Sequence, residues 1–228
     1  MRCLPYLVAL AAVTLGGCSR DADQGAERRT PMPASLAGVY FGLLPCSNCT
    51  AIEATLWLRP DGRFFLRQHF KNDETPAEPL GPATTYGLGR WSWDEVSAEA
   101  VLRGRGPERR LVVRDADRLQ LRVPSPVEQV LERDTTAPPF ADRLVLDGES
   151  AVTDNAATFT ECITGLTFGV LDAGAYRELR RQHRRMNPRG RVALTTVEGH
   201  LVTASDGSTT GERLVVDRFI AIKPGSGC

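Results

Sequence analysis

Apolar and polar side chains alternate along much of residues 36–133, and this period of two predicts β-strands. Residues 54–59 alternate in this way, and Pro60-Asp61-Gly62 follows them. This tripeptide favours a tight turn, because proline presets φ and glycine accepts positive φ. Residues 63–70 then predict the returning strand of a hairpin. Short strands are also expected at residues 89–93, 100–102, 111–113, 119–123 and 129–131, a spacing that favours a small up-and-down β-barrel.

A helical pattern occurs once, in residues 173–186. Its apolar stripe, Tyr176, Leu179, His183 and Met186, recurs at spacings of three and four. Strands are expected around it at residues 166–170, 191–197, 200–203 and 214–222. One helix among about five strands favours an OB-like β-barrel. The predicted fold class is therefore mainly β, with two barrels in sequence.

Two shifts in composition divide the chain. Residues 18–35 are polar, charged and proline-bearing, which predicts a flexible tether. Residues 134–142, DTTAPPFAD, predict a linker. The first barrel domain is therefore expected at 36–133 and the second at 143–228.

The N-terminus predicts the compartment. Arg2 precedes an apolar run, Leu4 to Leu15, that is shorter than the roughly 20 residues needed to span a bilayer. Residues 1–17 therefore predict a secretory signal peptide. Leu15-Gly16-Gly17-Cys18 resembles the bacterial lipobox, which implies cleavage before Cys18 and diacylation of its thiol. The alternative is an ordinary signal peptide with an incidental cysteine. Ser19 in place of a retention aspartate favours the outer membrane, with the protein facing the periplasm.

The net charge of the chain indicates no particular class of partner. The chain has 28 basic and 28 acidic residues, so it has no global attraction for nucleic acid or anionic surfaces. Arginines nevertheless cluster along the predicted helix and just after it, at Arg177, Arg180, Arg181, Arg184, Arg185, Arg189 and Arg191. The signal peptide opposes a nucleic-acid role for this cluster. A solvated face, an acidic partner and anionic lipid headgroups remain as interpretations.

Four cysteines remain after Cys3 is removed with the signal peptide and Cys18 is lipidated: Cys46, Cys49, Cys162 and Cys228. An even number in an oxidising compartment predicts disulfides, with three possible pairings. Local spacing favours Cys46–Cys49 and Cys162–Cys228. The second pair would close a long loop and stabilise the fold by roughly 4 kcal/mol in the chain-entropy model. It could be a structural disulfide or a sensor of oxidative folding.

Cys46 and Cys49 allow three kinds of chemistry: a structural disulfide, a redox switch or a Cu(I) site, since soft thiolates select Cu(I). His69, on the returning strand, is a possible further ligand. A thioredoxin-type enzyme is disfavoured, because this C-x-x-C precedes a hairpin and not a helix. The chain also lacks G-x-S-x-G, H-E-x-x-H and phosphate-loop motifs. We therefore expect no enzymatic activity.

Several stretches resemble the NlpE family of envelope lipoproteins: YFGLLPCSNC at residues 40–49, GRW at 89–91, ECITG at 161–165 and the closing PGSGC. Ala51 departs from the family pattern, which usually has glycine there. The resemblance implies a lipocalin-like first barrel, an OB-like second domain and outer-membrane attachment. It also implies roles in copper homeostasis and in signalling envelope stress to an inner-membrane sensor kinase. The alternative is a small-ligand-binding or purely structural envelope lipoprotein.

Overall fold

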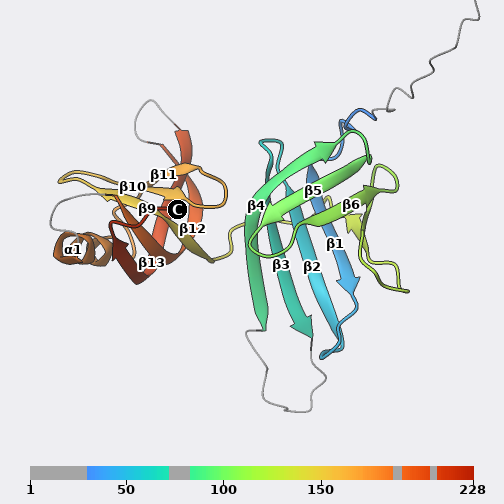
Figure 1. Ribbon diagram of the computed structural model, residues 1–228, viewed down its shortest axis with the longest axis horizontal. Coiled ribbons are helices and arrows are strands. Elements are labelled where there is room, and N and C mark those ends of the chain that lie inside the picture. Colours follow the sequence, from blue (N-terminus) through green and yellow to red (C-terminus); the bar gives the residue numbers. More distant parts are fainter. Residues whose placement is uncertain (1–29, 72–82, 187–191, 206–209) are drawn as a thin grey trace, which may run out of the picture.

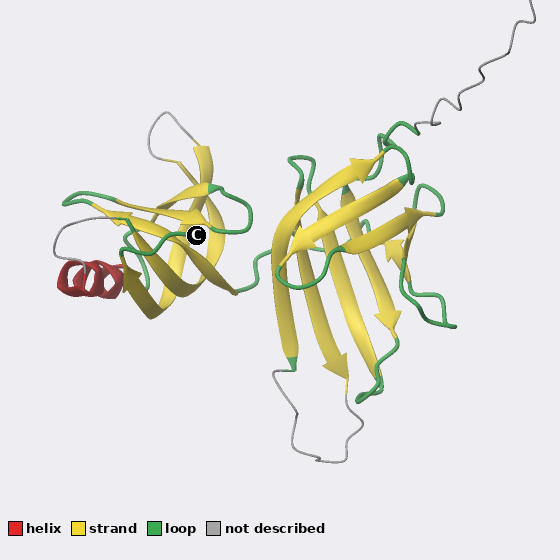
Figure 2. Ribbon diagram, in the orientation of Figure 1, coloured by secondary structure: helices red, strands yellow, loops and turns green. Residues whose placement is uncertain are grey.

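A computed structural model describes residues 30–71, 83–186, 192–205 and 210–228. These residues form two closed β-barrels and one helix, side by side along the longest axis (Figures 1 and 2). The predicted fold class is confirmed. No helix within the described ranges is long and apolar enough to cross a membrane. The predicted signal peptide and Cys18 lie outside the described residues.

The first barrel is an antiparallel meander in which each strand pairs with the next. Its strands are β1 (Gly38–Leu44), β2 (Ala51–Leu58), β3 (Arg63–Lys71), β4 (Thr84–Asp94), β5 (Glu99–Gly104), β6 (Arg109–Val113), β7 (Arg118–Leu121) and β8 (Val130–Arg133). The barrel closes where Tyr40 and Phe41 of β1 pair with β8.

The predicted hairpin is β2–β3, and its turn has the expected chemistry. Gly62 has a positive φ of 79°, and its N–H donates to the carbonyl of Arg59. Side chains on the inward positions fill the barrel with an apolar core: Leu36, Tyr40, Leu44, Ala54, Leu56, Leu58, Phe64, Leu66, Trp91, Ala100, Leu102, Leu111, Leu119 and Leu131. The alternation that predicted the strands also separates this core from the outer face.

The second barrel has the strand order β10-β11-β13-β12-β9. Its elements are β9 (Leu144–Val152), β10 (Ala157–Glu161), β11 (Thr167–Val170), α1 (Tyr176–Met186), β12 (Ala193–Ser205) and β13 (Thr210–Pro224). β11 and β13 run parallel, and the other pairs are antiparallel. Tyr176, Leu179 and His183 of α1 are buried, and α1 packs against β13.

Three details of the prediction were wrong. The helix begins at Tyr176 and not at Ala173, because Gly174 adopts a positive φ of 55° in the preceding turn. Met186 is not in the core: it ends the helix and is 47% exposed. Residues 193–205 form one strand with register shifts, where two strands had been expected.

The sequence patterns also gave no prediction of strands β1, β9 and β10.

Gly199 explains why β12 was expected as two strands. A Cβ there would lie 2.4 Å from the carbonyl oxygen of Val215, so glycine permits close approach of the paired strands at a bulge.

Candidate functional site

The Cys46–Cys49 disulfide lies in the connection between β1 and β2, with a Cα–Cα distance of 5.3 Å. The described chain begins at the other end of this barrel. There the N–H of Thr30 donates to the carbonyl of Glu95, and the indole of Trp93 donates to the carbonyl of Thr30. Because β4 runs antiparallel to β1, its end at Asp94 is opposite the end where β1 leads to Cys46 (Figure 1). The disulfide therefore lies at the barrel end farther from Thr30, where the described chain begins.

Both sulfurs of this pair are in a covalent bond, so neither is a free thiolate. Copper(I) would need the reduced pair. His69, the predicted further ligand, is on the outer face of β3, where its Nδ1 lies 2.9 Å from the hydroxyl of Thr84. Within the described ranges, no group of three or more His, Cys, Asp and Glu side chains could hold a metal ion.

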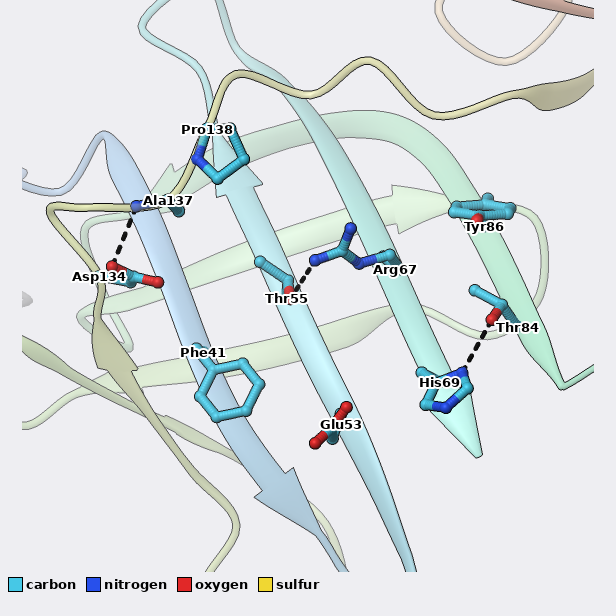
Figure 3. A pocket seen from close by; sticks show the side chains of 10 residues that line it. All are labelled: Phe41, Glu53, Thr55, Arg67, His69, Thr84, Tyr86, Asp134, Ala137 and Pro138. Carbon is cyan, nitrogen blue, oxygen red and sulfur yellow. Dashed lines mark hydrogen bonds between the residues drawn. The ribbon is translucent and has the colours of Figure 1, made fainter. Parts of the chain in front are cut away.

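His69 instead lines a hollow of about 530 Å³ on the outer face of β1–β4 (Figure 3). Its walls are Phe41, Glu53, Thr55, Arg67, His69, Thr84, Tyr86, Asp134, Ala137 and Pro138. Neither cysteine belongs to this lining. No sequence pattern had indicated the hollow, although the outward positions of β2 and β3 carry the polar residues that form its floor.

The linker after β8 forms one edge of the hollow. The carboxylate of Asp134 accepts hydrogen bonds from the hydroxyl and N–H of Thr136 and the N–H of Ala137, which lower its pKa below the ordinary 3.8. The indole of Trp57 donates to the carbonyl of Pro138 at 3.1 Å. The linker is therefore held against the sheet.

Phe140 of the linker joins the two barrels. Its ring stacks on Phe65 with centroids 4.3 Å apart, and it meets Trp57 edge to face at 5.1 Å. These outward residues of β2 and β3 belong to the same apolar cluster as Leu144 and Leu146 of β9. A lone aromatic residue in a linker of small, polar and proline residues was a sequence signal for this docking.

Charged contacts lie beside this apolar cluster. Arg63 is only 7% exposed, and it lies 2.5 Å from Asp61 and 2.6 Å from Glu212 of β13. The pair with Glu212 is close but not aligned as a hydrogen bond. Arg59 donates to the same Glu212 carboxylate at 2.7 Å. Burial alone would raise the pKa of Asp61, but hydrogen bonds from Arg63 outweigh it and hold that pKa below 3.8.

The Cys162–Cys228 disulfide joins the turn after β10 to the last residue of the chain, with a Cα–Cα distance of 5.3 Å. The N–H of Cys228 also donates to the carboxylate of Glu149 at 3.0 Å. Both disulfides have the pairing that local spacing favoured.

Two side chains of the first barrel contact the surroundings of Cys162. Arg90 of β4 donates from Nε to the carbonyl of Thr164 at 2.7 Å. Arg105, between β5 and β6, forms an ion pair with Asp147, whose carbonyl accepts the N–H of Cys162 at 2.9 Å. The Cys162 loop is thus part of the contact between the barrels, which no sequence pattern had indicated.

Most of the chain matches the models of a known protein family. Residues 40–122 match the family described as NlpE N-terminal domain, and residues 142–228 match NlpE C-terminal OB domain. The chain belongs to the NlpE family. It is 29% identical over 219 residues to Lipoprotein NlpE of Escherichia coli K12, covering 89% of this chain and 85% of the relative.

Two solved structures are also similar to this NlpE-family chain. One is the Cpx pathway activator NlpE from Escherichia coli, with 23% identity, a TM-score of 0.36, and coverage of 87% of this chain and 98% of that one. The other is a putative lipoprotein from Shewanella oneidensis, with 20% identity, a TM-score of 0.35, and coverage of 49% and 96%.

Proposed function

We propose that this chain is a lipoprotein anchored in the outer membrane through diacylated Cys18, which reports envelope stress to an inner-membrane sensor kinase. Membership of the NlpE family supports the proposal, since the E. coli member is named a lipoprotein and a Cpx pathway activator. The sequence LGGC at residues 15–18 supports the anchor.

The position of Cys162 carries the sensing part of the proposal. Its loop lies between two contacts to the first barrel, Arg90 with Thr164 and Arg105 with Asp147. Reduction of Cys162–Cys228 takes two electrons and two protons from a dithiol donor of the envelope and frees both the loop and the C-terminus. The contact between barrels then loosens, and the first barrel becomes available to its partner.

Cys46 and Cys49 form a second sensing site, which responds to copper. When reduced, their two thiolates at the exposed barrel end bind one Cu(I) ion, because thiolate is the ligand type that Cu(I) prefers. His69 is held by Thr84 in the outer hollow, so we assign no copper ligand beyond the two sulfurs.

A reporter strain tests the sensing proposal. The full chain is expressed in a Gram-negative host that carries a Cpx-pathway reporter, as wild type, as C162S/C228S and as R90A/R105A. Both double variants should raise reporter output at normal expression, and overproduced wild type should raise it as well. The exposed pair R103A/R114A is the control and should leave output at the wild-type level. Silence of every chain, including overproduced wild type, would overturn the proposal.

Copper is tested separately. The reduced chain from residue 19 onward is titrated with Cu(I) against a competing chelator in a C162S/C228S background, so that Cys46 and Cys49 supply the only thiolates, alongside C46S/C49S in the same background. One equivalent should bind to the chain that keeps Cys46 and Cys49 and none with comparable affinity to the chain that lacks them. Equal binding by both chains would remove copper from the function of this pair.

A second function, small-ligand binding, is favoured by the outer hollow. Phe41 and Tyr86 form its aromatic walls, and Arg67 and Thr55 provide hydrogen-bonding groups on its floor (Figure 3). The interior of the first barrel is packed by its core, so a ligand would bind outside. Saturable binding of a small ligand by the wild-type chain that is lost in T55A/R67A, with unchanged thermal stability, would favour this function.

A further inference from the structure

We propose that the outward face of α1 is a docking surface for anionic phospholipid headgroups. The surface is formed by four arginines, Arg177, Arg181, Arg184 and Arg185 (hereafter the arginine face), all of them exposed. At 3.6 residues per turn these four positions fall within about 100° of arc. The opposite side of the helix carries the buried Tyr176, Leu179 and His183, so the arginine face points to solvent.

The charge on this face is poorly compensated. Arg177 and Arg185 have no acidic partner among the residues that the structure describes. Arg181 pairs with Glu178 and Arg184 with Asp154 at 3.1 Å, but both arginines are more than 60% exposed, so these pairs are weak. Asp172 is a further exposed acidic residue, just before the helix.

Arg180 has a separate, structural role and is not part of the face. Its guanidinium donates to the carbonyl of Thr153 at 3.3 Å and stacks over Tyr176 at 5.6 Å. These contacts hold the helix against the β9–β10 turn. The other four arginines are therefore presented on a fixed helix, which lowers the cost of ordering them on a surface.

A lipid surface fits this geometry better than a folded partner. The face is the convex outside of a helix and presents several guanidinium groups, which bind phosphate in bidentate fashion. The apolar stripe is already used on the second barrel, so the helix cannot insert. Met186, 47% exposed beside Arg185, adds a small apolar contact. Such a surface predicts peripheral, salt-sensitive association.

The placement of the helix extends the inference. α1 lies at the end of the longest axis away from the point where the described chain begins (Figure 1). A chain tethered at its N-terminus would thus present the arginine face away from its tethered end. Arg189 and Arg191, which follow the helix, lie outside the described residues and carry no part of the inference.

The test is co-sedimentation with vesicles of phosphatidylcholine containing about 30% phosphatidylglycerol. The chain from residue 19 onward is used, because acyl chains on Cys18 would bind vesicles by themselves; it keeps every described residue. The wild type should bind these vesicles, bind neutral vesicles weakly, and be released by 0.5 M salt. Because each basic residue near an anionic surface adds to the attraction, R177Q/R181Q/R184Q/R185Q should lower the partition coefficient by more than about tenfold.

A matched quadruple variant controls for net charge. R103Q/R114Q/R118Q/R218Q removes four exposed arginines from other faces and should change partitioning by less than about threefold. Lysine at all four positions of the arginine face should restore binding. Circular dichroism and thermal unfolding check that every variant is folded.

Three results would overturn the proposal: no wild-type binding at low salt, an equal loss in both glutamine variants, or unchanged binding when the arginine face is removed. In the last case, loss of reporter activation by the same variant would assign the face to an acidic protein partner instead. None of these results depends on the proposed signalling function, because vesicle binding is measured without a host.

Discussion

Arg90 of β4 donates a hydrogen bond to the backbone carbonyl of Thr164, two residues after Cys162 in the sequence. This contact joins the first barrel to the loop that the second disulfide anchors. Under the proposed function, this contact is the route by which the redox state of Cys162 would reach the other domain.

The first prediction concerns the contact between Arg90 and the Cys162 loop. Reducing Cys162–Cys228, or substituting Arg90 by Ala, should speed proteolytic cleavage in the linker at residues 134–142, because both changes loosen the contact that holds the barrels together. Limited proteolysis with mass spectrometry measures the cleavage rate. R103A, an exposed arginine on β5, is the control. Unchanged cleavage after full reduction of the disulfide would show that the contact does not depend on it.

The two disulfides should differ in their contribution to stability. In the chain-entropy model, the free-energy gain rises with loop length, to about 4 kcal/mol for Cys162–Cys228 and about 2 kcal/mol for Cys46–Cys49. C162S/C228S should therefore destabilise the fold more than C46S/C49S. Denaturant unfolding under non-reducing conditions checks this order, and a reversed order would contradict the expectation.

Phe140 should stabilise the contact between domains. Truncation in F140A removes the stacking on Phe65 and the edge contact with Trp57, for an expected loss of about 1–3 kcal/mol. Indole fluorescence of Trp57 should also change, because the loss of the Phe140 ring exposes the indole to more solvent. F140L, which keeps apolar volume without the ring, should lose less. Equal stability of F140A and wild type would mean that the linker is not held by this residue.

Glu212 should contribute more to the stability of the fold than a comparable exposed acidic residue. Glu212→Gln leaves the nearly buried Arg63 with only Asp61 and should cost about 1–2 kcal/mol. Glu198→Gln breaks the pair with exposed Arg218 and should stay within about 0.5 kcal/mol. Chemical unfolding of the two variants is the measurement. Similar losses in both would argue that the Arg63 pair contributes no more than a surface pair.

His183 should make the fold sensitive to mild acid. Burial lowers its pKa below the ordinary 6.5, with a weak opposing effect from the Ser150 carbonyl. The unfolded chain therefore takes up the proton first, so stability should fall as the pH drops below about 6.5 and level off below the folded-state pKa. Thermal unfolding between pH 7.5 and 5 checks this. H183Q should flatten the slope, and H69Q, at a half-buried site, is the control.

The sequence predicted local structure well where a single strand or helix decides it. The hairpin around Pro60-Asp61-Gly62 and the helix containing Leu179 follow from turn chemistry and periodicity, which need no partner. Gly199 misled the prediction of β12, because a glycine inside a strand has the same pattern as a break between two strands. Only the close approach of Val215 shows that it is a bulge.

The sequence by itself determined the class of the fold, because strand and helix periodicity are local patterns, and its motifs carried the resemblance to the NlpE family. It favoured one of three cysteine pairings, and the tertiary structure decided that pairing by bringing Cys162 and Cys228 together. The tertiary structure alone decided that His69 turns to Thr84 in an outer hollow. It also decided that Arg63 meets Glu212 and that Arg90 reaches the Cys162 loop. The last two contacts join residues far apart in sequence, and no local pattern encodes them because they depend on how two separately formed barrels dock. The contact of His69 depends instead on the register between β3 and β4, which pairs it with Thr84.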